Sequence, residues 1–194
     1  NQNPLITRYF HNKVIFYGRL FFQNYLEHFS GEFLFLKNGF PIRYRIPWTG
    51  NLYPIECIFL LFGFSVLLVE GIKEKKFLYL IPIIWLLLAA VPAGLTWEDI
   101  PNVQRSIMML PGLVIITAYG FSEFLKIVNP LRIRKTVILV VLIAFSYNFI
   151  SFLHNYFHHS FTHQPWHRNV GEKELVLTIQ QLSKEYEKII MTSC

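Results

Sequence analysis

The sequence predicts an all-α membrane protein with about four transmembrane helices, an interfacial amphipathic helix and the beginning of a small extracytoplasmic α/β tail. Of its 194 residues, 53% are hydrophobic and only 15% are charged, whereas soluble domains carry about 25% charged residues. The apolar residues also gather in long blocks with few charges, which is the pattern of segments that cross a bilayer. We therefore expect hydrocarbon rather than water to surround most of the chain.

Residues 1–53 are expected to form an extracytoplasmic loop that contains the interfacial helix. Residues 12–29 have helical periodicity, because Arg19, Gln23 and Glu27 recur every fourth residue while the remaining surface is apolar and aromatic. Such a helix lies in the headgroup plane or packs against other helices, and the sequence favours neither. The apolar run at residues 33–36, between two turns, is expected to be a strand or a buried corner.

Residues 54–157 are predicted to form a bundle of four spans. The spans cover residues 55–72, 77–95, 106–126 and 136–157, each close to the roughly 20 residues that a hydrocarbon core requires. Pro82, Pro92 and Pro111 lie inside or near the ends of spans, where neighbouring helices can tolerate them.

Two short basic connections set the predicted orientation. Residues 73–76 contain three lysines, and residues 132–135 contain two arginines and a lysine. The positive-inside rule makes their side cytoplasmic, so residues 96–105 and the C-terminal tail are expected outside. Lys37, Arg43 and Arg45 conflict with this orientation. We assign the net charge of +6 to contacts with membrane lipid headgroups and expect no nucleic-acid partner.

Residues 158–194 are predicted to be an extracytoplasmic tail with a truncated soluble domain. Residues 172–186 have the pattern of an amphipathic helix, with Leu175, Ile179 and Leu182 at core spacing, and residues 189–191 resemble the start of a buried strand. The chain does not begin with Met and stops just after this run. We therefore expect it to be a piece of a longer protein.

Five histidines lie around the junction between the last span and the tail. At helical spacing, His154 would meet His158, and His159 would meet His163, as a metal-binding face. A proline at position 165 argues against a continuous helix there. We favour interfacial histidines and expect no metal site from this group, whose fifth member is His167.

The most informative stretch for function is the loop at residues 96–105, at the mouth of two spans. The guanidinium of Arg105 can bind a lipid phosphate at headgroup depth through a bidentate fork, with Asn102 and Gln104 beside it. The alternative is that Arg105 only snorkels to headgroups. Glu98 and Asp99 could orient a substrate or bind a divalent metal through oxygen, although a solvated acidic loop is the simpler interpretation.

Glu56 is the remaining candidate, because an ionisable side chain inside a span is a functional candidate by default. It lies about one turn inside the first predicted span, so it could instead reach interfacial water, which we favour. The sequence contains no glycine-rich phosphate loop, nucleophile elbow or cysteine–histidine metal signature. No cofactor is evident, and no residues of the sequence specify a complete active site.

Several runs together resemble bacterial polytopic glycosyltransferases of the GT-C type, related to the protein mannosyltransferase and aminoarabinose transferase families. The runs are residues 12–13, 24–30, 33–35, Gly50 with 53–56, 101–106, 110–112 and 119–120. The resemblance implies a many-span bundle, of which this chain is the C-terminal half, in a bacterial inner or plasma membrane. It also implies sugar transfer from a polyprenyl-phosphate donor to a lipid, glycan or protein acceptor at the outer face.

The resemblance also bears on individual residues. It places the catalytic acidic residue in an outer loop upstream of this chain, and it implies that Arg105 binds phosphate. Asn102 departs from the family pattern, because relatives often have histidine there, so a proton-transfer role at this position is in doubt.

Two other classes of function stay open. A transporter or flippase of lipid-linked molecules predicts internal repeats and ionisable or broken-helix sites at the membrane midplane, whereas the second span is free of charge and no repeat is visible. A noncatalytic membrane subunit that binds partners through its tail fits the sequence as well. An acidic residue in an upstream outer loop would favour the transferase.

Overall fold

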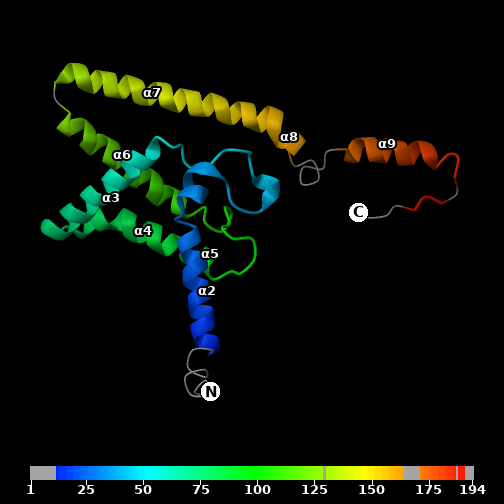
Figure 1. The fold of residues 1–194 in the computed structure, drawn as a ribbon, viewed down its shortest axis with the longest axis horizontal. Coiled ribbons are helices and arrows are strands. Elements are labelled where there is room, and N and C mark those ends of the chain that lie inside the picture. Colours follow the sequence, from blue (N-terminus) through cyan, green and yellow to red (C-terminus); the bar gives the residue numbers. More distant parts are fainter. Residues whose placement is uncertain (1–11, 129, 164–170, 187, 191–194) are drawn as a thin grey trace, which may run out of the picture.

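The structure, a computed structural model, describes residues 12–128, 130–163, 171–186 and 188–190. Within these ranges all regular structure is helical, and one isolated bridge joins Phe40 and Asn102 (Figure 1). Three helical segments are long and apolar enough to cross a membrane, namely Phe77–Gly94, Met109–Ile127 and Leu131–His159. The fold is therefore compatible with the predicted membrane-embedded helical protein.

Helix α2, Lys13–Glu27, confirms the helix predicted at residues 12–29. Its N-terminus is capped by Asn12, whose side-chain oxygen accepts a hydrogen bond from the Val14 N–H at 3.2 Å. The C-terminal half packs on α5, whereas Phe16 and Phe22 remain exposed. In Figure 1, α2 runs across the direction of α7. The helix thus combines a packed end with an exposed apolar surface.

The run at residues 33–36 forms a buried corner and not a strand. It lies in a π-helical turn, Glu32–Leu36, in which Phe33 and Leu34 are buried. The Leu52 N–H donates to the Leu34 carbonyl at 2.7 Å, and the Phe40 N–H donates to the Pro101 carbonyl at 2.7 Å. These bonds pack the segment before the first span onto the loop that precedes α6.

Helix α3, Glu56–Lys73, coincides with the first predicted span and packs on α6, Met109–Ile127. The two backbones touch at Gly63 and Gly120. A Cβ added at Gly63 would lie 2.1 Å from the Ile116 carbonyl oxygen. Small residues that allow such close approach are typical of helix pairs in membranes.

The predicted count of four spans is not confirmed for α3. It has 18 residues, but Glu56, Glu70 and Lys73 fall within its bounds. The structure therefore supports three spans by length and composition.

The second predicted span is divided into a 3-10 helix, Phe77–Leu80, then α4, Ile81–Ala89, and α5, Val91–Gly94. The division between α4 and α5 follows from Pro92, which has no N–H to donate and whose ring conflicts with the carbonyl of Leu88 one turn earlier. The short α5 turns the chain toward α2 and the loop at residues 96–105 (Figure 1).

Helix α7, Leu131–His154, forms the fourth predicted span and has no buried side chain. A π-helical turn, Asn155–His159, and α8, Ser160–His163, continue the helical backbone beyond residue 157. The prediction that no continuous helix passes through these histidines is therefore wrong as far as His163.

The tail contains the predicted helix as α9, Glu172–Leu182. The predicted strand is not confirmed, because residues 188–190 form no strand, and Met191 lies outside the described residues. A strand needs a partner for its N–H and C=O groups, and none is present in the described part of the tail. The expected α/β character is therefore not shown.

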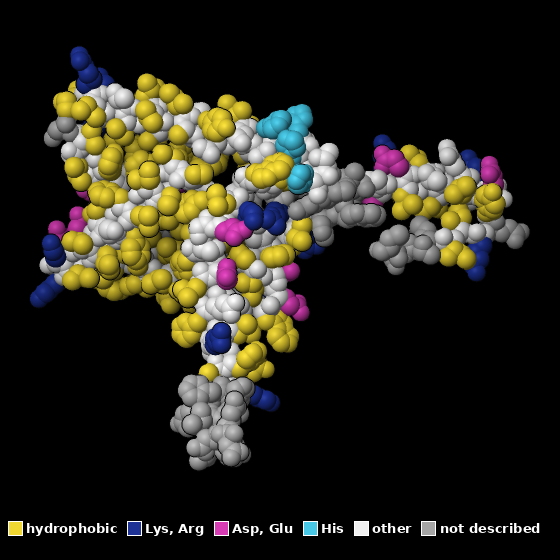
Figure 2. Space-filling view, in the orientation of Figure 1, with side chains coloured by type: hydrophobic (Ala, Val, Ile, Leu, Met, Phe, Trp, Pro, Cys, Tyr) yellow, Lys and Arg dark blue, Asp and Glu magenta, His cyan; other side chains and the backbone are white. Residues whose placement is uncertain are grey.

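The charges divide the bundle into two ends. The basic connections at residues 73–76 and 132–135 lie at the end where α3 meets α4 and α6 meets α7, and dark blue side chains project there in Figure 2. Residues 96–105 lie at the opposite end, against α2 (Figure 1). The conflict from Lys37, Arg43 and Arg45 persists, because these side chains line recesses with Asp99 or Pro101, at the end of residues 96–105.

Candidate functional site

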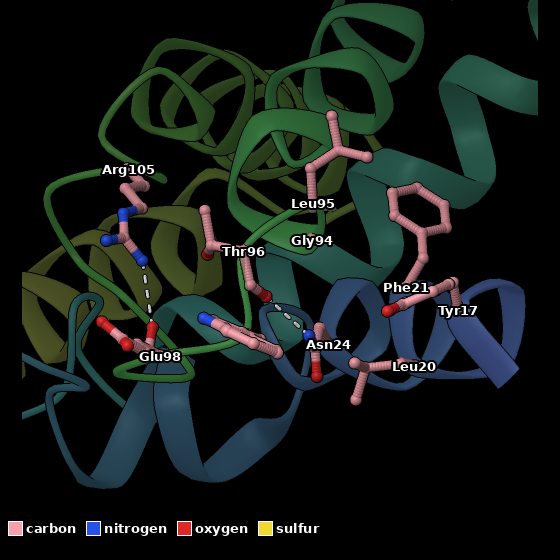
Figure 3. A pocket seen from close by; sticks show the side chains of 10 residues that line it. Tyr17, Leu20, Phe21, Asn24, Gly94, Leu95, Thr96, Glu98 and Arg105 are labelled. Atoms are coloured by element: carbon pink, nitrogen blue, oxygen red, sulfur yellow. Dashed lines mark hydrogen bonds between the residues drawn. The ribbon is translucent and has the colours of Figure 1, made fainter. Parts of the chain in front are cut away.

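A cleft of about 610 Å³ opens where α2 meets the loop that follows α5 (Figure 3). One wall comes from α2 and is largely apolar and aromatic, and the other comes from the loop. The lining residues are Tyr17, Leu20, Phe21, Asn24, Gly94, Leu95, Thr96, Trp97, Glu98 and Arg105. The cleft therefore joins a hydrophobic wall to a rim that carries one cation, Arg105, and one carboxylate, Glu98.

Two hydrogen bonds hold α2 to the second span beside the cleft, and a third holds the turn at Thr96. The buried side chain of Asn24 donates to the Thr96 carbonyl at 2.6 Å (Figure 3). The Tyr25 hydroxyl donates to the Leu87 carbonyl at 2.9 Å, and the Thr96 hydroxyl donates to the Ala93 carbonyl at 2.8 Å. A buried amide needs such a partner, so these bonds fix the spacing between the walls.

Arg105 places an exposed guanidinium at the loop side of the cleft. Its Nη1 donates to the backbone carbonyl of Glu98 at 3.0 Å (Figure 3). Among the described residues, no carboxylate forms an ion pair with Arg105. A guanidinium carries five N–H donors, so the positive charge and several donors remain available to an anionic ligand.

Asn102 is buried beneath the turn that carries Arg105 and does not line the cleft. Its side-chain oxygen accepts the Arg105 backbone N–H at 3.0 Å, and its carbonyl accepts the Ser106 hydroxyl at 2.7 Å. Asparagine commonly stabilises turns through such side-chain to backbone bonds. Asn102 therefore orients the turn, whereas the sequence suggested direct contact with a ligand.

The other predicted site residues lie in different places. The Glu98 side chain lines the cleft, whereas Asp99 lines a separate recess with Arg43, so the two carboxylates do not converge on one cation. Gln104 is exposed outside the lining. The Glu56 carboxylate accepts the Tyr53 N–H at 2.6 Å and so closes the turn that precedes α3.

His28 is a site residue that the sequence did not reveal. It is fully buried, its Nδ1 lies 2.7 Å from the Asn24 carbonyl oxygen, and its Nε2 lies 3.0 Å from the Asn102 nitrogen. A carbonyl only accepts and an N–H only donates, so Nδ1 carries the proton and the imidazole is neutral. Burial lowers the pKa of His28, against the opposing effects of the Asn24 bond and the Glu27 charge.

The described histidines near the tail gather around the π-helical turn. Its wider spacing brings the Nε2 atoms of His154 and His159 to 3.2 Å from each other, and Trp48 packs on His159 and His163. In the described part of the chain, no group of three His, Cys, Asp or Glu residues could hold a metal ion. His167 lies outside the described residues.

Comparisons with protein-family models, curated proteins and solved structures find no match to this chain. The functional argument therefore rests on the residues of the cleft, on their geometry and on the position of the cleft in the bundle.

Proposed function

We propose that this chain is the C-terminal half of a membrane glycosyltransferase that moves a sugar from a polyprenyl-phosphate donor to a lipid, glycan or protein acceptor at the outer face of the membrane. The observation that carries the proposal is the Arg105 guanidinium, which meets no carboxylate of the described chain and lies at a cleft with an aromatic wall.

The two sides of the cleft suit the two parts of such a donor. A polyprenyl phosphate has an anionic head and a long apolar chain. Arg105 would bind the phosphate through charge-assisted hydrogen bonds, while Leu20 and Phe21 would contact the chain. During transfer the phosphate leaves and gains negative charge, which Arg105 would stabilise electrostatically. Glu98, on the same rim, would orient the sugar or the acceptor.

The proposal includes α3 as a fourth span. Its ionisable residues lie in its first and last turns, so residues 57–69 are uncharged. Glu70 accepts a hydrogen bond from the Tyr119 hydroxyl of α6 at 2.6 Å, which satisfies a polar group near the end of the helix. With the basic connections in the cytoplasm, α2 and the cleft would lie at the outer headgroup level.

Cysteine labelling tests this topology. In full-length protein with Cys57 and Cys194 replaced by serine, a membrane-impermeant maleimide on intact cells is expected to label Gln104→Cys and not Glu74→Cys. Both positions are exposed loop residues at opposite ends of the bundle. Labelling of Glu74→Cys alone would reverse the orientation, and permeabilised cells, in which both should react, control for reactivity.

Sugar transfer from a polyprenyl-phosphate donor by the full-length protein tests the activity. Arg105→Ala is expected to lower kcat/KM by about 100-fold or more, the usual effect of removing a group that stabilises transition-state charge. Arg43→Ala removes an exposed arginine that does not line the cleft and should transfer at the wild-type rate. If Arg105→Ala and Arg43→Ala transfer sugar at the same rate at low donor concentration, the donor phosphate does not bind at Arg105. Movement of the lipid between leaflets without transfer would favour a flippase.

A further inference from the structure

One chain of hydrogen bonds connects α2 to the backbone of Arg105. The Asn102 N–H donates to His28 Nε2 at 3.0 Å, and the Arg105 N–H donates to Asn102 Oδ1 at 3.0 Å. His28 is 0% exposed and Asn102 is 3% exposed. Water therefore does not reach these polar groups, and each is satisfied only by the hydrogen bond to its neighbour in this row.

This connection joins the two elements that form the cleft walls, at buried residues outside the cleft lining. Helix α2, whose C-cap is His28, supplies the apolar wall through Leu20 and Phe21. The loop at residues 96–105, which contains Asn102, supplies Arg105. The bond from Asn102 to His28 thus sets the position of Arg105 relative to the apolar wall. An amphipathic ligand that uses both walls would depend on that position.

We propose that His28 is a positioning residue, whose neutral imidazole accepts the Asn102 N–H and thereby presents Arg105 at the cleft. This inference rests on the proposed function and extends it. It adds His28, which contacts no ligand but fixes the position of Arg105, which does. Only an acceptor at the Nε2 position fulfils the role. A protonated ring would turn a second N–H toward the Asn102 N–H and break the connection.

The surroundings of His28 determine the sign of the pH effect. The ring contacts the Asn24 carbonyl, the Asn102 N–H and the Phe33 ring, and Glu27 is the charged group that acts on it. Burial lowers the pKa of the ring from its ordinary value of 6.5. His28 binds a proton more readily when the loop is released than when the loop is docked, so docking weakens as the pH falls below about 6.5.

The test measures binding of polyprenyl phosphate to full-length protein in nanodiscs. His28→Gln offers an oxygen acceptor that does not titrate, and His28→Phe keeps a ring of similar shape without an acceptor. At pH about 7.5, we expect His28→Gln to bind like the wild type and His28→Phe to bind about tenfold more weakly. Between pH about 7 and about 5.5, the wild type should lose affinity and His28→Gln should lose much less.

His158→Gln, at an exposed histidine, is the matched control and should keep the wild-type pH dependence. Wild-type affinity in His28→Phe, or an unchanged pH dependence in His28→Gln, would overturn the inference. If His28→Phe does not fold, the comparison of His28→Gln with the wild type decides alone. If Arg105→Ala binds polyprenyl phosphate with wild-type affinity, both the proposed function and this inference are wrong. If Arg105→Ala lowers the affinity but the His28 variants do not change it, only this inference is wrong.

Discussion

Arg105→Ala is expected to weaken the affinity of the full-length protein for polyprenyl phosphate roughly 10- to 150-fold. Hydrogen bonds to charged groups contribute about 1.5–3 kcal/mol, which corresponds to this range in Kd. We expect a loss of affinity near the upper limit of this range, because Arg105 forms no ion pair with a carboxylate among the described residues and its charge is available to the ligand. Titration of the lipid into protein in nanodiscs measures the effect.

Two variants separate charge from geometry in this experiment. Arg105→Lys keeps the charge but loses the planar fork that binds a phosphate through two bonds, so its affinity should fall between those of the wild type and Arg105→Ala. Arg43→Ala removes a cation that lines a recess with Asp99, outside the cleft lining, and should bind normally. Equal losses in Arg105→Ala and Arg43→Ala would indicate a nonspecific surface charge effect.

Gly63→Leu is expected to destabilise the bundle more than any other single change considered for this chain. Even a Cβ at this position would lie 2.1 Å from the Ile116 carbonyl oxygen, which is backbone and cannot rotate away. Inserting carbon atoms into a packed interface costs about 1–3 kcal/mol, and here α3 and α6 would have to separate. The Tm of the purified full-length protein in detergent should fall clearly.

Gly18→Ala is the matched control for this prediction. Gly18 lies inside α2, and an added Cβ would meet no atom within 4 Å. Alanine favours the helix over glycine by about 0.5–1 kcal/mol, so the Tm should stay constant or rise slightly. A Tm in Gly63→Leu equal to that of Gly18→Ala would show that α3 and α6 do not pack at this crossing.

The helices could be predicted from sequence because hydropathy and length report directly on them. The apolar blocks at residues 77–95 and 106–126 correspond to α4 with α5 and to α6. Pro92 explains why the second span is divided at Ala90, although the sequence alone did not place the division. The strand expected at residues 189–191 depended on local propensity, which is weak without a paired strand.

The candidate site could be predicted only in part. Residue type and loop position pointed to Arg105, because an exposed guanidinium at a span end suits a phosphate. The burial of Asn102 could not be inferred, since it results from packing of the loop onto residues 28–40. His28 lies 74 residues before its partner, and a contact of that separation leaves no local pattern in one sequence.

The most direct measurement compares two ligands that differ only in the phosphate, a polyprenyl phosphate and the polyprenol of the same chain length. Full-length wild-type protein is expected to bind the phosphate at least about tenfold more tightly than the alcohol. Arg105→Ala should bind both with nearly equal affinity. Wild-type protein that binds the two lipids equally well would contradict the assignment of the cleft as a lipid-phosphate site.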